Sequence, residues 1–207
     1  WKLPPRWDRK ARREHRMAKV FCASLADVFE DRPELVPWRD ELLSLIHTTP
    51  NLYWQLLTKR PESFHKRMAL AVDSKTDGTG SGGDFWQWCV NWWAGDAPSN
   101  VSVGASVEDQ ANADRRIHQL LKIPAKVRFL SVEPMLGPVK MTLRCPLDHN
   151  GDGDCHNHPN GCPRIDWVIV GGESGPGARP CNVEWIRDVV KQCAAAKVPC
   201  FVKQLGS

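Results

Sequence analysis

The segment Asp166-Trp167-Val168-Ile169-Val170-Gly171-Gly172-Glu173 runs from four consecutive apolar residues directly into two glycines and a carboxylate. An uninterrupted apolar run of this length is typical of a strand that is covered on both faces, as in parallel sheets. Five further segments have the same form, and helical patterns lie between them. They are residues 19–24, 52–58, 101–106, 127–132 and 200–204. The sequence therefore predicts an α/β fold with six parallel strands and helical crossovers.

Polar side chains stand at the point where each predicted strand ends. They are Ser24 and Asp27, residues 58–60, Ser106 and Glu108, Glu133, Glu173 and Ser174, and Lys203 and Gln204. In a barrel of parallel strands these ends converge on one mouth, whereas an open sheet concentrates them at one switch point. Polar groups at all six ends favour a partial (β/α) TIM-like barrel. We expect one such domain over residues 1–207, with insertions at about 73–100 and 140–164.

The composition is that of an ordinary globular protein, with 42% apolar and 25% charged residues. No run approaches the roughly 18 apolar residues of a membrane span, and no apolar signal sequence opens the chain. We therefore expect a cytoplasmic protein without a membrane partner. Because the first residue is Trp1 rather than Met, we also expect a processed, trimmed or fragmentary chain.

Two features raise the possibility of a nucleic-acid partner. Residues 1–20 carry eight Lys and Arg against Asp8 and Glu14, which gives this arm a net charge of +6. Such an arm can contact phosphates, or it can be a solvated, partly helical segment. Four tryptophans lie within residues 86–93, and they can stack on bases or pack a helix on the core. The sequence alone leaves both pairs of alternatives open.

A loop over residues 145–162 contains three Cys and three His. Thiolate and imidazole groups at this density suit a tetrahedral zinc site. The preferred ligands are Cys145, Cys155, His158 and Cys162. Four protein ligands leave no open coordination position, so such a zinc ion would be structural. The alternative is a loop that binds no metal.

The run that follows the 167–172 strand is rich in glycine and includes Glu173 and Arg179. Glycine lets a backbone approach a ligand closely, a carboxylate can hold an amine or a ribose hydroxyl, and Arg179 can hold a carboxylate or phosphate. Lys59 and Arg60 offer two more cations for an anion at another strand end, and both sites have a plain turn as the alternative. Glu133, directly after an apolar strand, needs a partner or a ligand if it is buried.

Six motifs in the same order resemble a phage-associated family related to radical S-adenosylmethionine (SAM) enzymes, with spore photoproduct lyase as a distant relative. They are Phe21-Cys-Ala-Ser-Leu-Ala-Asp27, Leu57-Thr-Lys-Arg-Pro61, Val103-Gly-Ala-Ser-Val-Glu108, Phe129-Leu-Ser-Val-Glu-Pro134, Asp166-Trp-Val-Ile-Val-Gly-Gly-Glu-Ser-Gly175 and Phe201-Val-Lys-Gln204. The resemblance covers nearly the whole chain. It implies a bacterial or phage-encoded partial barrel that binds SAM and a [4Fe–4S] cluster.

The resemblance also implies a reaction and a set of cofactor-binding residues. The reaction is reductive cleavage of SAM to a 5′-deoxyadenosyl radical, which abstracts hydrogen from a substrate such as a nucleic acid or nucleobase. The implied SAM-binding residues are Ser106, Glu108, Glu133, Gly171, Gly172, Glu173, Lys203 and Gln204. The family's Cys-x6-Cys-x2-Cys triplet is missing. We therefore expect a chain that lacks its N-terminus and first barrel strand, inactive alone although the full-length protein is an enzyme.

Two alternatives belong to other functional classes. The first is a nucleic-acid-binding module without catalysis, which would use the basic arm and the tryptophans. The second is a metal-dependent hydrolase on a barrel, with a divalent ion near Glu108, Glu133 and Glu173. No histidine pair stands at those strand ends, so the hydrolase ranks last.

Overall fold

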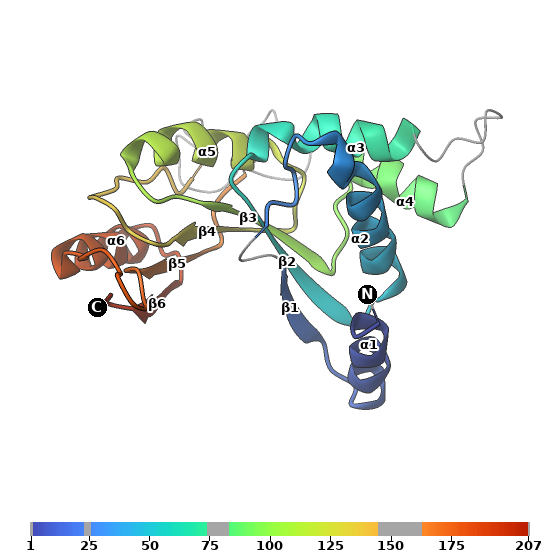
Figure 1. Ribbon diagram of the computed structural model, residues 1–207, viewed down its shortest axis with the longest axis horizontal. Coiled ribbons are helices and arrows are strands. Elements are labelled where there is room, and N and C mark those ends of the chain that lie inside the picture. Colours follow the sequence, from blue (N-terminus) through green and yellow to red (C-terminus); the bar gives the residue numbers. More distant parts are fainter. Residues whose placement is uncertain (1, 23–25, 74–82, 145–162, 207) are drawn as a thin grey trace. The chain divides into compact units, whose positions relative to one another are not determined.

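The structure is a computed structural model that describes residues 2–22, 26–73, 83–144 and 163–206 (Figure 1). The described residues include six strands, and helices separate all neighbouring strands of the chain except the fourth and fifth. The strands are β1 (Ala18–Cys22), β2 (Leu52–Thr58), β3 (Val101–Ser106), β4 (Val127–Val132), β5 (Trp167–Gly171) and β6 (Cys200–Gln204). They form one sheet in the order of the sequence, and the pairs β1–β2, β4–β5 and β5–β6 are parallel. The predicted α/β class with sequential parallel strands, as in a partial TIM-like barrel, is confirmed.

The described residues also include six α-helices and two short 3₁₀ helices, of which α1 precedes the first strand and the others lie between strands. They are α1 (Pro4–Arg13), η1 (Pro33–Leu35), α2 (Val36–Thr48), η2 (Pro61–Ser63), α3 (Phe64–Asp73), α4 (Asp84–Trp93), α5 (Gln110–Lys122) and α6 (Val183–Ala195). Helix α5 shows why they pack on the sheet, because Ala113, Ile117 and Leu120 recur at helical spacing and are buried. Asn182 is the N-cap of helix α6, and its side chain accepts a hydrogen bond from the Glu184 N–H.

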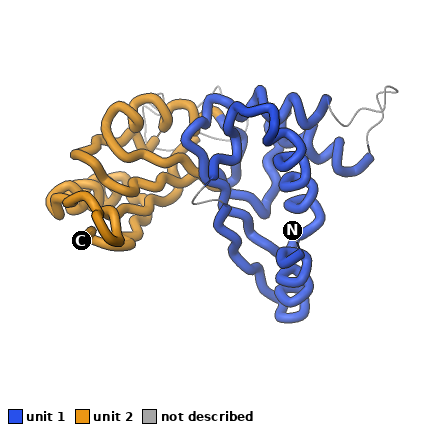
Figure 2. Tube along the Cα trace, in the orientation of Figure 1, with its two compact units in different colours: residues 1–103, 123–126 blue, residues 104–122, 127–207 orange. Residues whose placement is uncertain are grey.

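The chain divides into two compact units (Figure 2). Unit 1 comprises residues 1–103 and 123–126, and unit 2 comprises residues 104–122 and 127–207. Each unit has its own buried apolar side chains. No helix of the described residues is long and apolar enough to cross a membrane.

Unit 1 has an aromatic core to which α4 contributes. Trp92 is fully buried, its ring centroid lies 5.6 Å from that of Phe64, and its indole N–H donates to the carbonyl of Pro124 at 2.8 Å. Phe64 in turn contacts the ring of Phe29 edge-on at 5.5 Å. The segment 84–93 is therefore a helix packed on the core, with Trp93, 46% exposed, on its outer side.

In unit 2, Gly104 of β3 lies close against Phe129 of β4. A Cβ atom at Gly104 would come within 2.4 Å of the Phe129 ring, so only glycine fits at this position. The Trp167 ring stacks on the Phe129 ring, with centroids 4.9 Å apart. Phe129 and Trp167 thus pack together near the amino ends of β4 and β5, whereas the candidate site lies at the carboxyl ends of these strands.

Candidate functional site

The carboxyl ends of β4, β5 and β6 lie along one edge of the sheet in unit 2. The register pairs Val132 with Val170 and Gly171 with Gln204. The residue that follows β4, the glycines that end β5 and the polar end of β6 are thereby brought together. We call this set the β4–β6 edge; it consists of Glu133, Gly171, Gly172, Lys203 and Gln204.

Glu133 is the carboxylate of the β4–β6 edge, and its side chain is only 14% exposed. Its Oε1 atom is buried and has no hydrogen-bond partner among the described residues. The Lys203 ammonium lies 3.4 Å from Oε1, an ion-pair distance that lacks hydrogen-bond geometry. The Ser131 hydroxyl donates a long bond of 3.4 Å to Oε2. A buried carboxylate oxygen without a hydrogen bond is costly, and among the described residues Glu133 Oε1 is the buried carboxylate oxygen that lacks one.

The two glycines of the β4–β6 edge approach protein atoms closely. A Cβ at Gly171 would lie 3.0 Å from Glu133 Oε1, and one at Gly172 would lie 2.7 Å from the Gly206 Cα. Gln204 ties this backbone together, because its side-chain amide donates to the Gly172 carbonyl at 2.7 Å. Sequence analysis assigned these glycines and Gln204 to the cofactor; in the structure their immediate contacts are with one another.

Glu173 and Arg179, expected to bind an amine or hydroxyl and an anion, pair with each other. The guanidinium donates to both carboxylate oxygens, at 2.7 and 3.1 Å, and the Arg179 backbone N–H donates a third bond of 2.9 Å. These bonds lower the pKa of Glu173 to about 2. A ligand at either side chain would have to compete with this pair.

Ser106 and Glu108, at the end of β3, are buried and joined to the interior of unit 2. Arg116 of α5 donates to the Ser106 carbonyl at 2.8 Å and to Glu108 Oε2 at 2.7 Å. The side chains of Arg116 and Glu108 are 8% and 10% exposed. The Glu108 carboxylate is therefore already paired with Arg116. Among the strand-end carboxylates, Glu133 is the one with a buried oxygen that accepts no hydrogen bond from the described residues.

Lys59 and Arg60 belong to unit 1, where Asp27 organises the turn after β2. The Asp27 carboxylate accepts from the Thr58 hydroxyl at 2.5 Å, the Lys59 backbone N–H at 2.9 Å and the Arg60 guanidinium at 2.9 Å. Arg60 also lies 3.7 Å from the Glu30 carboxylate. Its charge is therefore matched within unit 1, which weakens the expected role as an anion ligand.

The expected metal ligands cannot be placed. Cys145, Cys155, His158 and Cys162 all lie outside the described residues. Across the ranges that the structure describes, no group of three or more His, Cys, Asp or Glu is arranged to hold a metal ion. The described residues therefore include no ligand set for an iron–sulfur cluster, and at the β4–β6 edge Glu133 and Lys203 carry opposite charges.

Arg116 is the important residue that sequence analysis missed. It lies on the apolar stripe of α5, between buried Ala113 and Leu120. An arginine at a position where helical spacing predicts an apolar residue indicates a buried carboxylate partner. Glu108, eight residues earlier at a strand end, was the available candidate.

Fold and site together define an α/β protein with a parallel sheet whose carboxyl edge carries a half-satisfied buried carboxylate. The chain belongs to the family described as "Protein of unknown function (DUF5131)", whose model matches residues 1–207. A search of curated proteins and a search of solved structures each found no match.

Proposed function

We propose that this chain is the SAM-binding body of a radical-SAM-like enzyme, and that the β4–β6 edge binds the methionine end of SAM. The observation that carries the proposal is the buried Oε1 of Glu133, which has no hydrogen-bond donor among the described residues. The motif resemblance and the parallel sheet with polar strand ends are consistent with it.

The charges at the β4–β6 edge suit an amino-acid zwitterion. The methionine part of SAM carries an ammonium group and a carboxylate on one carbon. Glu133 Oε1 can accept from that ammonium, while the Lys203 ammonium, 3.4 Å away and half exposed, can turn toward the carboxylate. Each new contact is a charge-assisted hydrogen bond, the stronger kind. The ligand would thereby satisfy the one buried carboxylate oxygen that has no hydrogen bond among the described residues.

The proposal assigns only the SAM side of the chemistry. If SAM were bound beside a reduced [4Fe–4S] cluster, the cluster would supply the electron that cleaves SAM into methionine and a 5′-deoxyadenosyl radical, and this radical would take the hydrogen atom from the substrate. Since the described side chains do not provide a cluster site, no residue here is given a role in cluster ligation. Glu133 and Lys203 would orient the amino-acid end, and the missing side chain at Gly171 leaves room for the Glu133 carboxylate, since a Cβ there would lie 3.0 Å from Oε1.

The pairing of the other strand-end carboxylates argues against the metal-dependent hydrolase. That alternative needs Glu108, Glu133 and Glu173 to share a divalent ion. Glu108 is bound to Arg116, and Glu173 is bound twice by the Arg179 guanidinium. Two of the three would have to leave cationic partners to become metal ligands, at the cost of leaving an arginine without its carboxylate.

The proposal is tested by SAM binding to the purified chain, measured by isothermal titration calorimetry under anaerobic conditions. We expect E133Q to weaken SAM binding about 10- to 100-fold, since one charge-assisted hydrogen bond is lost. Free methionine should compete with SAM, whereas adenosine alone should not depend on Glu133. The matched control is E184Q on α6, because Glu184 is exposed and its ion pair among the described residues is with Arg187 on the same helix.

Thermal unfolding of the same samples separates binding from stability. The proposal fails if wild-type protein shows no SAM binding, or if E133Q binds SAM as tightly as E184Q does. It also fails if E133Q lowers the melting temperature while the affinity of the remaining folded protein is unchanged, because Glu133 would then be structural.

A further inference from the structure

We infer that the basic face of α1, defined by Arg6, Arg9 and Arg13, binds the phosphate backbone of double-stranded DNA. This surface belongs to unit 1, whereas the proposed SAM site belongs to unit 2. The inference therefore stands whether or not the chain binds SAM.

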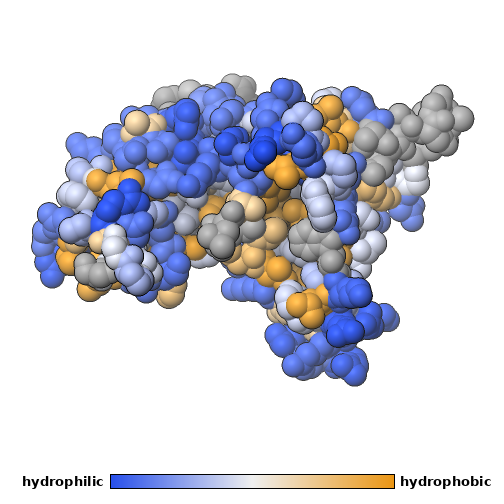
Figure 3. All heavy atoms as spheres, viewed as in Figure 1, coloured by the Kyte–Doolittle hydropathy of each residue, from blue (hydrophilic) through white to orange (hydrophobic). Residues whose placement is uncertain are grey.

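Helix α1 has two opposite faces. Pro4 and Ala11 are buried on one side. At roughly 100° per residue, Arg6, Arg9 and Arg13 cluster on the other side. Their side chains are exposed, and the α1 region in the space-filling view is mostly hydrophilic (Figure 3).

The body of unit 1 fixes which face of α1 points outward. The Asp8 carboxylate accepts from the backbone N–H of Asn51 at 2.8 Å and from its side-chain amide at 3.1 Å. Ala11 is 1% exposed. The rotation of the helix is thus set by a buried apolar contact and a side-chain clamp, so the arginines cannot turn inward without breaking both.

The acidic residues of this segment leave most of its positive charge unmatched. Asp8 is used by Asn51, and Glu14 pairs with Arg16 at 2.6 Å and with Lys10 at 3.8 Å. The other arginines of α1 make no ion pair within the described part of the chain. They are Arg6, Arg9, Arg12 and Arg13. These four neighbouring cations make no ion pair with the described residues, although the Arg13 charge also acts on Glu14. Together they create a field that attracts a polyanion.

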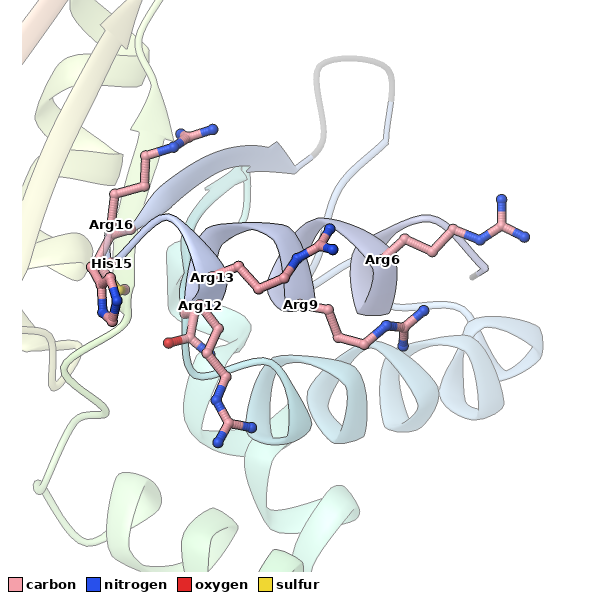
Figure 4. Close-up of a pocket in the computed structure, with 8 residues that line it drawn as sticks. Arg6, Arg9, Arg12, Arg13, His15 and Arg16 are labelled. Atoms are coloured by element: carbon pink, nitrogen blue, oxygen red, sulfur yellow. The ribbon is translucent and has the colours of Figure 1, made fainter.

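The arginines also line a hollow on the surface. It is a wide, open space of about 1010 Å³, bordered by the five arginines between residues 6 and 16 together with His15, Met17 and Asn51. Figure 4 shows the guanidinium groups spread along the helix rather than gathered on one point. This distribution suits a chain of phosphates better than a single small anion.

The geometry favours duplex DNA over single strands and membranes. Arg6 and Arg13 are about 10.5 Å apart along the axis at a rise of 1.5 Å per residue, and a duplex presents about one phosphate per 1.7 Å of axis. Single-strand sites use aromatic platforms, but Trp7 lies roughly 100° or more around the helix from each of these arginines. A membrane helix turns its apolar face outward, whereas Ala11 is buried in unit 1.

The test is fluorescence anisotropy of a labelled 20-base-pair DNA duplex with the full chain, between about 50 and 200 mM NaCl. Phosphate contacts from the three arginines of this face and from the neighbouring Arg12 predict a slope of log affinity against log salt near −3.6. This slope corresponds to about 100-fold weaker binding over that range. In R6Q/R9Q/R13Q we expect a slope near −1 and at least about tenfold weaker binding at the lowest salt. Glutamine keeps the helix propensity of the segment.

The control variant R115Q/K122Q/K191Q removes the same charge from exposed positions on α5 and α6. We expect its affinity and salt slope to stay close to those of the wild type. If the triple α1 variant loses helical circular dichroism, each single Arg-to-Gln change is measured instead, with a slope shallower by about 0.9 each.

Three results would overturn the inference. The first is a wild-type protein that does not bind the duplex at the lowest salt, and the second is an equal loss of affinity in both triple variants. The third is a preference for another polyanion: a single-stranded 20-mer bound more tightly than the duplex, or vesicles with phosphatidylserine bound when the duplex is not.

Discussion

Replacing Arg116 by Met should destabilise unit 2 strongly, because it leaves the buried Glu108 carboxylate without its cation. Arg116 donates to Glu108 at 2.7 Å and to the Ser106 carbonyl at 2.8 Å, and both charged side chains are at most 10% exposed. Methionine fills the aliphatic part of the arginine but supplies no hydrogen bond.

The size of the effect follows from what remains buried. Removing one partner of a buried ion pair costs about 3–5 kcal/mol, most of it from the uncompensated charge. For a chain of this length each kcal/mol lowers the melting temperature by roughly 2–4 °C, so R116M should melt about 10 °C lower. E108Q should cost less, about 1–2 kcal/mol, because a glutamine carbonyl can still accept from Arg116.

The assay is a double-mutant cycle of the wild type, R116M, E108Q and R116M/E108Q. The free energy of unfolding of each protein is measured by urea and thermal unfolding, monitored by circular dichroism. Once the carboxylate is neutral, R116M should do less damage, so the double variant should be more stable than R116M alone. The expected coupling free energy is about 2 kcal/mol. Equal destabilisation by R116M with and without E108Q would refute the argument, since the loss would then come from packing around Arg116.

Two further expectations follow from single contacts. The bonds to Arg179 hold the pKa of Glu173 near 2, so the native pair contributes stability above about pH 4.5 that is lost as pH falls toward 2. An NMR titration of the Glu173 carboxyl should show a midpoint near 2, and R179Q should return this midpoint toward 4.5. If R179Q leaves the midpoint unchanged, the pair does not form in solution. Trp92 is buried and hydrogen-bonded to the Pro124 carbonyl, so W92A should lower the free energy of unfolding by about 3–5 kcal/mol. Trp93 is half exposed, so W93A should change it by no more than about 1 kcal/mol. Equal losses in the two variants would contradict the packing of α4.

The strands were predictable because their burial leaves a direct trace in the sequence. All six residues of β3 are buried, so the segment 101–106 is continuously apolar or small, and its predicted limits equal the observed ones. Helix ends were harder to place. The helical spacing of the leucines and isoleucine in residues 39–47 predicts a helix there, but α2 begins three residues earlier, at Val36, because Pro37 is tolerated in the first turn of a helix.

The candidate site was predictable in position but not in its pairing. Strand ends can be predicted from the sequence, and these predict Glu133 and Lys203 as site residues. The sequence does not predict that their side chains lie 3.4 Å apart. Which carboxylates are already satisfied depends on partners that local pattern does not show. Glu108 finds its arginine on the following helix, and Glu173 finds Arg179 across a loop with two positive-φ glycines.

The two binding experiments together separate the functional classes that the sequence left open, because the surfaces lie in different units and can fail independently. Loss of SAM binding in E133Q with duplex binding through Arg6, Arg9 and Arg13 would indicate an enzyme that acts on, or is held at, DNA. Duplex binding without SAM binding would favour the module without catalysis. SAM binding without duplex binding would keep the enzyme and turn the search to a substrate that is not a polyanion. The arrangement of charges favours the first outcome, since unit 1 leaves cations unmatched on one helix face and unit 2 leaves one buried carboxylate oxygen without a donor among the described residues.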